Sequence, residues 1–379
     1  MKKGRGRFVI YLLAAVAVIS AAAAYWVPRY FEAAWFLEDI AAGPSPSMWK
    51  TLHAAPTASG ARWTVEGRAG EGDLYTPTEK IKGRMIFVPG LVADARRDPR
   101  VIAFAETLAR AGFLTLVPQT TAFDGLKANA GDIQTLHDAA TWLADTDFPD
   151  APKTRIGIAA LSYMAGPALL AASRAPLNEK VGFVFFIGGY YSMTDVIRFV
   201  TTRKFRLNDN EPWREESPAD YALWAFLAAQ AQGIEGPDRD RLIAIASAKL
   251  KNSNADVTAI VATLESEGHA IYALIDNRDP DKVDALVTAL PAPLRAQLDA
   301  LDPSKQDLSG FTADALLVHG KDDPLIASTE SEKLAAALGG RAHLYLLEQV
   351  THVEVNRAGS FWDQLDMLFA GRRLLSYRE

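Results

Sequence analysis

One serine of this chain lies where a short apolar run turns into a second one, and this placement could make it a nucleophile. The run from Ile156 to Leu161 predicts a buried parallel strand, and the alanine- and leucine-rich stretch that ends at Ser173 predicts a helix. Ser162 lies between them. A sharp turn from strand to helix lifts a hydroxyl out at the carboxyl end of a sheet and aims the first backbone N–H groups of the helix at the space beside it. The alternative is an ordinary serine that caps a helix.

A serine hydroxyl needs a base, and candidates for a base and an acid follow two later predicted strands. His352 comes soon after the predicted strand Ala342–Leu347, and Asp322 and Asp323 follow the predicted strand Ala315–His319. Because ligands bind at the carboxyl ends of the strands in open α/β sheets, these side chains can meet the serine there. An imidazole can remove the hydroxyl proton and later return it to a leaving group, while a carboxylate fixes the ring's tautomer. The residue types therefore suit acyl transfer.

Along the chain the serine comes first, then the candidate acid, then the histidine. In this order of nucleophile, acid and histidine the chain resembles the α/β-hydrolase superfamily. The family's nucleophile motif is Gly-x-Ser-x-Gly, and this sequence departs from it with Ala160 and Met164 at the glycine positions. Gly166, two residues beyond the methionine, is expected to relieve part of the crowding. Pro167 lies slightly deep for a first helical turn, so the helix is expected to begin bent or late.

The resemblance implies a role for each residue of the site. Ser162 would be the nucleophile, His352 the general base and Asp323 the acid, with Asp322 as its fallback. Asp195, after the preceding strand, is a weaker alternative for the acid, because some lipases place theirs there. His319 is expected to be structural.

The resemblance also implies an oxyanion hole made of two backbone N–H groups. The loop after the first central strand usually carries His-Gly in the family, and Pro89-Gly90 stands there in this chain. The two donors would be the backbone N–H groups of Leu91 and Tyr163. Backbone donors depend on the shape of the loop, so the missing histidine does not prevent this role.

The sequence predicts an α/β fold, specifically the α/β-hydrolase fold, with a mostly parallel sheet covered by helices on both faces. Arg62–Glu66 and Gly72–Tyr75 predict a hairpin at the edge of the sheet. Further predicted strands and helices alternate along the chain: strands Arg84–Val88, Phe113–Val117 and Val181–Ile187, and helices Val101–Ala111 and Asp132–Asp145.

From residue 190 to residue 307 the alternation stops and helical patterns dominate. The predicted helices are Ala219–Ala231, Arg239–Leu250, Val257–Leu274 and Lys282–Ala300. The resemblance implies that this insertion is a helical cap over the active site. The predicted organisation is a signal-anchor segment at 1–27, a connector at 28–60, the core at 61–189 and 308–379, and the cap at 190–307.

The N-terminus predicts export and an uncleaved membrane anchor. Residues 1–7 are basic, and the 20 residues from Phe8 to Val27 carry no charge. At about 1.5 Å per residue such a helix spans roughly the 30 Å core of a bilayer. The basic cluster should stay in the cytoplasm, which places the rest of the chain on the periplasmic side of a bacterial inner membrane. A cleaved secretory signal is the alternative. The next segment, Tyr30–Leu37, predicts an amphipathic helix that lies either on the membrane or on the body.

Composition narrows the function further. The 379 residues are 49% hydrophobic, carry a net charge of −6 and include no cysteine. A nucleic-acid surface is not indicated, and disulfides, a cysteine nucleophile and thiolate metal sites are excluded. The resemblance implies neither a metal nor an organic cofactor.

We therefore expect a serine hydrolase that cleaves a carboxylic ester of a small molecule or lipid-like substrate through an acyl-enzyme. Two alternatives remain open. One is a non-catalytic protein of the same fold that binds a lipid or a partner at the cell envelope. The other is an amidase or acyltransferase that uses the same triad.

Overall fold

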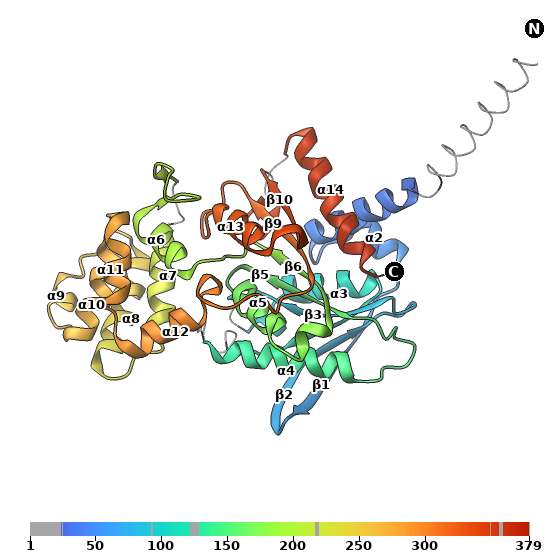
Figure 1. Cartoon of the computed structure of the whole chain (residues 1–379), viewed down its shortest axis with the longest axis horizontal. Helices are drawn as coiled ribbons and strands as arrows, with labels where there is room; N and C mark the ends of the chain where they lie inside the picture. Colours follow the sequence, from blue (N-terminus) through green and yellow to red (C-terminus); the bar gives the residue numbers. More distant parts are fainter. Residues whose placement is uncertain are drawn as a thin grey trace, which may run out of the picture.

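A twisted eight-stranded sheet forms the centre of the molecule in the computed structural model, which describes residues 24, 26–91, 94–121, 129–216, 220–348, 350–355 and 359–378 (Figure 1). The strand order is β1-β2-β4-β3-β5-β6-β9-β10. The pairs β1–β2 and β2–β4 are antiparallel, and the other neighbours are parallel, so the predicted mostly parallel sheet is confirmed. The strands are β1 Thr57–Val65, β2 Arg68–Thr76, β3 Gly83–Val88, β4 Phe113–Pro118, β5 Ile156–Leu161, β6 Val181–Ile187, β9 Asp314–Gly320 and β10 Ala342–Leu347.

The edge of the sheet is the predicted hairpin, which is longer than the sequence indicated. β1 and β2 are joined by the two residues Glu66 and Gly67, both with positive φ (49° and 80°). A two-residue turn with φ positive at both positions matches the twist of the paired strands, and it therefore sets their register.

Helices cover both faces of the sheet, as β3 shows. Arg84 points towards the carboxyl end of α4 (Gly131–Asp145), whose carbonyls at Leu143 and Ala144 accept its hydrogen bonds. Phe87, of opposite parity, stacks on Phe104 of α3 (Pro99–Arg110) at 4.7 Å between ring centroids. Since alternate side chains of a strand point to opposite faces, α3 and α4 lie on opposite sides.

The α3 face also carries the two ends of the described chain. Tyr377, just after α14 (Phe361–Ser376), stacks on Phe183 of β6 at 4.3 Å. A helix over residues 26–42 packs beside α14, followed by α2 (Met48–Leu52), and these three elements lie together in Figure 1. The sequence patterns did not predict α14.

Between β6 and β9 the chain forms a helical lobe at the end of the molecule opposite α14 (Figure 1). Its helices are α6 Met193–Thr202, α7 Asp220–Ala231, α8 Pro237–Lys251, α9 Thr258–Val261, α10 Ser266–Asp276, α11 Val283–Thr288 and α12 Ala292–Ala300. A small hairpin of β7 (Lys204–Phe205) and β8 (Arg214–Glu215) interrupts the helices.

Two predicted helices of the lobe are each divided in two. The prediction Val257–Leu274 was wrong because the buried carboxylate of Asp238 accepts hydrogen bonds from the backbone N–H groups of Glu265 and Gly268, which start a new helix. The prediction Lys282–Ala300 was wrong because Pro291 ends one helix and precedes the next. A proline cannot donate the hydrogen bond that would continue a helix.

The chain enters and leaves the lobe at one place. The Tyr190 hydroxyl donates to the carbonyl of Leu301 at 2.8 Å, and the Ser304 N–H donates to the carbonyl of Tyr191 at 2.9 Å. The two crossing segments are therefore joined directly to each other.

The predicted membrane segment, Phe8 to Val27, falls almost entirely outside the described residues. Within the described ranges, no helix combines the length and the apolar character needed to cross a bilayer.

Candidate active site

Ser162 occupies the turn between β5 and the following helix. It begins a short 3₁₀ turn, Ser162–Met164, and the regular helix α5 (Ala165–Ser173) starts only after it, so the helix begins late, one of the two outcomes expected from Pro167. The φ of Ser162 is +54°, in the left-handed region that residues other than glycine rarely adopt. Such a conformation persists where the surrounding structure enforces it, often at functional sites. The turn forms although Met164 replaces the usual glycine, and the methionine side chain is fully buried.

Gly166 has a different neighbour from the one expected. A Cβ at this position would lie 2.2 Å from the Tyr190 hydroxyl, so the space is filled by Tyr190. A Cβ on Gly189 would meet the Cβ of Ala165 at 2.8 Å. These small residues let α5 approach the segment that follows β6.

His352 lies at the tip of a two-residue-strand hairpin, β11 (Val350–Thr351) and β12 (Glu354–Val355), just beyond β10. Its φ is +55°. Its Nδ1 lies 2.8 Å from Oδ2 of Asp323, and its Nε2 lies 2.7 Å from Oγ of Ser162. An ionised carboxylate only accepts, so Nδ1 carries the proton, and Nε2 of the neutral ring is left to accept from the serine hydroxyl.

Asp323 is buried, with 2% of its surface exposed, and it is held by its own turn. Its Oδ1 accepts hydrogen bonds from the backbone N–H groups of Leu325 (2.8 Å) and Ile326 (3.0 Å). Burial alone would raise the pKa of this carboxyl. Hydrogen bonds from His319 and His352, and attraction to the His352 ring when that ring is protonated, outweigh burial and hold the pKa of Asp323 well below its ordinary range.

The other two candidate acids lie elsewhere. Asp195 is on α6, where it pairs with Lys333 at 2.7 Å and with Arg198. Asp322 is exposed, whereas its neighbour Asp323 contacts His352. The structure thus brings Ser162, His352 and Asp323 together.

His319 also contacts Asp323, which the sequence analysis missed. Its Nε2 lies 3.0 Å from the carbonyl oxygen of Ile326 and 3.3 Å from Oδ2 of Asp323, and its Nδ1 lies 2.7 Å from Oγ of Ser331. A carbonyl only accepts, so Nε2 carries a proton, and the Ser331 hydroxyl is the partner of Nδ1. The available signal was its position, four residues before Asp323 at the end of β9.

Two glycines pack directly against these residues. A Cβ on Gly188 (φ +63°) would lie 3.2 Å from Nδ1 of His352 and 3.3 Å from Oδ2 of Asp323. A Cβ on Gly90 would lie 3.2 Å from the Cβ of Ser162. Both positions therefore need the smallest residue for the loops to approach the site.

The two predicted oxyanion donors belong to residues beside the serine. Leu91 directly follows Gly90, which packs on Ser162, and Tyr163 directly follows the serine. The side chain of Tyr163 is buried and stacks on Tyr190 at 6.2 Å between centroids. Burial raises the pKa of the Tyr163 phenol far above its ordinary value, so its side chain is not an acid at neutral pH.

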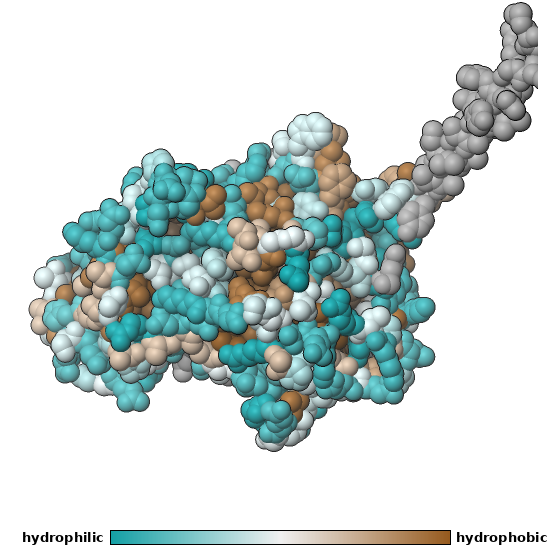
Figure 2. All heavy atoms as spheres, viewed as in Figure 1, coloured by the Kyte–Doolittle hydropathy of each residue, from teal (hydrophilic) through white to brown (hydrophobic). Residues whose placement is uncertain are grey.

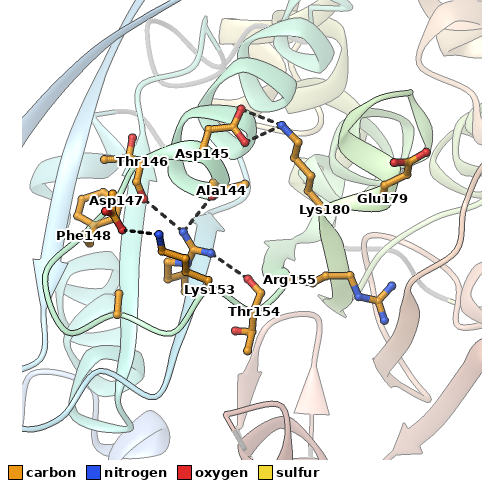
Figure 3. Close-up of a pocket in the computed structure, with 12 residues that line it drawn as sticks. Ala144, Asp145, Thr146, Asp147, Phe148, Lys153, Thr154, Arg155, Glu179 and Lys180 are labelled. Carbon is orange, nitrogen blue, oxygen red and sulfur yellow. Dashed lines mark hydrogen bonds and ion pairs between the residues drawn. The ribbon is translucent and has the colours of Figure 1, made fainter.

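A cavity of about 300 Å³ lies at the end of the sheet where the parallel strands begin, opposite the strand ends that carry Ser162 and His352 (Figure 3). The Arg84 guanidinium donates there to the carbonyls of Leu143, Ala144, Thr146 and Thr154. Two ion pairs complete the wall, Lys180 with Asp145 (2.6 Å) and Lys153 with Asp147 (3.3 Å). The arginine binds the carbonyls at the end of α4, which is a structural role.

Among the described residues, no group of three or more histidines and carboxylates is arranged to hold a metal ion. The chemistry that the site itself can supply is proton transfer and nucleophilic attack by the serine.

Comparisons with known proteins identify the fold. No family model matches the chain, and no curated protein matches it in sequence. A Legionella pneumophila protein, classed provisionally as a hydrolase, has a similar structure at 13% identity and a TM-score of 0.51, over 85% of this chain and 88% of that one. A lipase in its open form matches at 15% identity and a TM-score of 0.47, over 85% and 99%. An esterase domain from Rhodothermus marinus matches at 13% and 0.41, over 85% and 97%.

The order and direction of the strands, with a serine at the turn after β5, are those of the α/β-hydrolase fold. The resemblance to the α/β-hydrolase superfamily is confirmed at the level of the fold.

Proposed function

We propose that this protein is a serine hydrolase that cleaves a carboxylic ester through an acyl-enzyme. The observation that carries this proposal is the continuous hydrogen-bonded chain from Ser162 through His352 to Asp323, with distances of 2.7 and 2.8 Å. Nucleophile, base and orienting acid within hydrogen-bond reach are the requirement for an activated serine.

In the proposed reaction, Oγ of Ser162 attacks the ester carbonyl carbon and its proton passes to Nε2 of His352. The resulting oxyanion is stabilised by the backbone N–H groups of Leu91 and Tyr163. The intermediate collapses, the C–O bond to the alcohol breaks, and the imidazolium gives its proton to the leaving alkoxide. Water then attacks the acyl-enzyme with His352 as base, and the acid leaves as Ser162 regains its proton. Asp323 stabilises the imidazolium in both halves.

We further propose that the protein is exported and remains anchored by its N-terminus, with the catalytic body on the periplasmic side of a bacterial inner membrane. The basic residues 1–7 and the charge-free run from Phe8 to Val27 support this proposal. The lobe of α6 to α12 would act as the cap that shapes the substrate pocket.

The test is labelling of the full chain with a fluorophosphonate probe, next to a Ser162→Ala variant of equal melting temperature. We expect stoichiometric labelling that is lost in the variant, because only an activated serine reacts with the probe. Matched esters and amides of the same acyl group then separate an esterase from an amidase. A folded chain that is not labelled would instead support a binding protein of this fold.

A further inference from the structure

Helix 26–42 is fixed to the body of the protein through two of its carboxylates. Asp39 is fully buried, where it accepts hydrogen bonds from Thr107 (2.6 Å) and Lys50 (2.5 Å). Glu32 pairs with Arg378 at 2.9 Å. Buried carboxylates need such partners, so this orientation of the helix is fixed by specific bonds.

The outer face of the same helix is apolar. Val27, Phe31 and Trp35 follow one another at helical spacing, and 49%, 57% and 38% of their surfaces are exposed. The rings of Phe31 and Trp35 lie 6.0 Å apart. A surface helix of a globular protein normally presents its polar side to water. This helix buries Ala33 and Phe36 against the body and also exposes the three apolar side chains above, which suits contact with an apolar or interfacial medium.

α14 extends this apolar surface. Phe361 and Trp362 in its first turn are 66% and 72% exposed, and Phe369 further along is 41% exposed and contacts Tyr30 at 6.0 Å. Nine of the twelve exposed large apolar residues of the described chain lie on helix 26–42, α2 and α14, so the surface is concentrated at one end of the molecule. Figure 2 shows pale and brown atoms over α14 there.

A basic hollow adjoins the first turn of helix 26–42. It measures about 500 Å³, and four of the residues around it are basic while one is acidic. Its lining residues are Pro28, Arg29, Glu32, Lys80, Lys82 and Arg378. A cationic hollow beside exposed aromatic residues matches the chemistry of a bilayer surface, which offers phosphate groups next to acyl chains.

We propose that this docking face, made of the outer side of helix 26–42, the exposed aromatic residues of α14 and the basic hollow, lies on a bilayer that contains anionic phospholipid. The inference rests on the proposed anchoring, because the charge-free run ends at Val27, on the docking face itself. An inserted run would hold Phe31 within about one helical turn of the bilayer surface. Trp and Phe side chains favour this interface, and the lysines of the hollow would meet lipid phosphates. The body is then held in one orientation instead of swinging freely.

The chain contains no cysteine, so single cysteines can be labelled without background. The full chain is reconstituted into phosphatidylcholine vesicles with and without phosphatidylglycerol, carrying an environment-sensitive fluorophore at Phe31→Cys or Trp362→Cys. Matched controls are Tyr221→Cys and Leu250→Cys, which are also exposed apolar positions but lie on α7 and α8 of the lobe. Vesicle flotation reports anchoring, and quenching by brominated lipid reports docking.

We expect the labels at positions 31 and 362 to be quenched by brominated lipid and the two lobe labels to stay unquenched. A chain that floats with vesicles while all four labels behave alike would overturn docking and leave anchoring intact. A chain that does not float would overturn both. Labels shielded from water without lipid quenching would indicate a second copy of the chain on this face and would also overturn the proposal.

The basic hollow has its own test. Lys80→Gln with Lys82→Gln should lower the ratio of docked to undocked chain about 25-fold in vesicles with anionic lipid, since each lysine near such a surface contributes about fivefold. Lys249→Gln with Lys251→Gln, on α8 of the lobe, should leave the ratio unchanged. Equal effects of the two pairs would contradict a role for the hollow.

Discussion

Asp323 serves two histidines at once. Its Oδ2 lies 2.8 Å from Nδ1 of His352 and 3.3 Å from Nε2 of His319, while its Oδ1 is held by two backbone N–H groups. A buried carboxylate with all its acceptor positions occupied stays ionised and stays in place. The orientation of His352 thus depends on a group that cannot itself move.

Replacing Asp323 by Asn should lower kcat for ester hydrolysis by up to about ten-thousandfold, because the amide no longer holds His352 in the tautomer that accepts from the serine. The measurement is steady-state hydrolysis of an activated ester. The matched controls are Asp322→Asn and Asp195→Asn, whose carboxylates do not contact His352, and these should change kcat far less. A larger loss of kcat at Asp322→Asn or Asp195→Asn would assign the role of the acid to that residue instead.

His319 should act as a positioning residue for Asp323. His319→Gln can keep a donor where Nε2 lies and should retain most of the activity, whereas His319→Leu removes it and should lower kcat about tenfold, the lower range for a lost hydrogen bond to a charged group. KM should change little, because His319 is buried. Ser331→Ala, which removes only the partner of Nδ1, separates this effect from general loosening of the turn. Equal kcat in the Gln and Leu variants would contradict the role.

At this scale the sequence predicted which residues meet at the site, except for His319. Ser162, Asp323 and His352 follow β5, β9 and β10, and parallel strands bring their carboxyl ends to one edge. Their catalytic roles remain predictions. The contact of His319 with Asp323 was missed because the position of His319, four residues before Asp323, places the two residues near each other but does not show which group the ring faces.

The end of β6 is the element that approaches the site most closely, and it does so through Gly188. Gly188→Ala should lower the free energy of unfolding by about 1–2 kcal/mol, the cost of a left-handed conformation for a residue with a Cβ. It should also lose activity, since that Cβ would lie 3.2 Å from Nδ1 of His352. Chemical denaturation and ester hydrolysis measure the two effects.

Gly43→Ala is the matched control. Gly43 also has a positive φ (+54°), but a Cβ there meets nothing within 4 Å. This variant should show a similar loss of stability with unchanged kcat. Unchanged kcat in Gly188→Ala as well would mean that the triad tolerates the crowding.

Helices and strands were predicted correctly where the spacing of apolar residues in the sequence matches the side chains that the fold buries. The central strands are mostly apolar, and their bounds were predicted within a residue or two. Helix 26–42 was predicted in part, at Tyr30–Leu37. α14 was missed because its exposed aromatic side chains obscure the pattern of its core-facing residues. In the lobe, one break depends on Asp238, a contact across 27 residues that periodicity does not contain.

Across the whole molecule, the lobe and the sheet body are joined by a partly buried cluster of charges. Glu330 of α13 (Thr329–Leu338) accepts from the N–H groups of Tyr191 and Ser192, where the chain enters the lobe. Lys333, also on α13, bridges Glu330 at 2.9 Å and Asp195 of the lobe at 2.7 Å. Burial keeps the pKa of Glu330 above its ordinary value, although Lys333 opposes this.

Lys333→Met should therefore destabilise the protein by about 3 kcal/mol near neutral pH, because it leaves Glu330 and Asp195 without their shared cation. The loss should be smaller near pH 5. A carboxyl whose pKa is raised by folding contributes its stability fully below its unfolded pKa, and that contribution is lost as the pH rises through the folded pKa. Urea denaturation at the two pH values measures this difference.

The control is Lys321→Met, which breaks an exposed pair with Glu348 and should lower the free energy of unfolding by less than about 1 kcal/mol at both pH values. An equal cost at both pH values in Lys333→Met would mean that Glu330 is not the group left uncompensated, and the joint between lobe and body would then depend on packing alone.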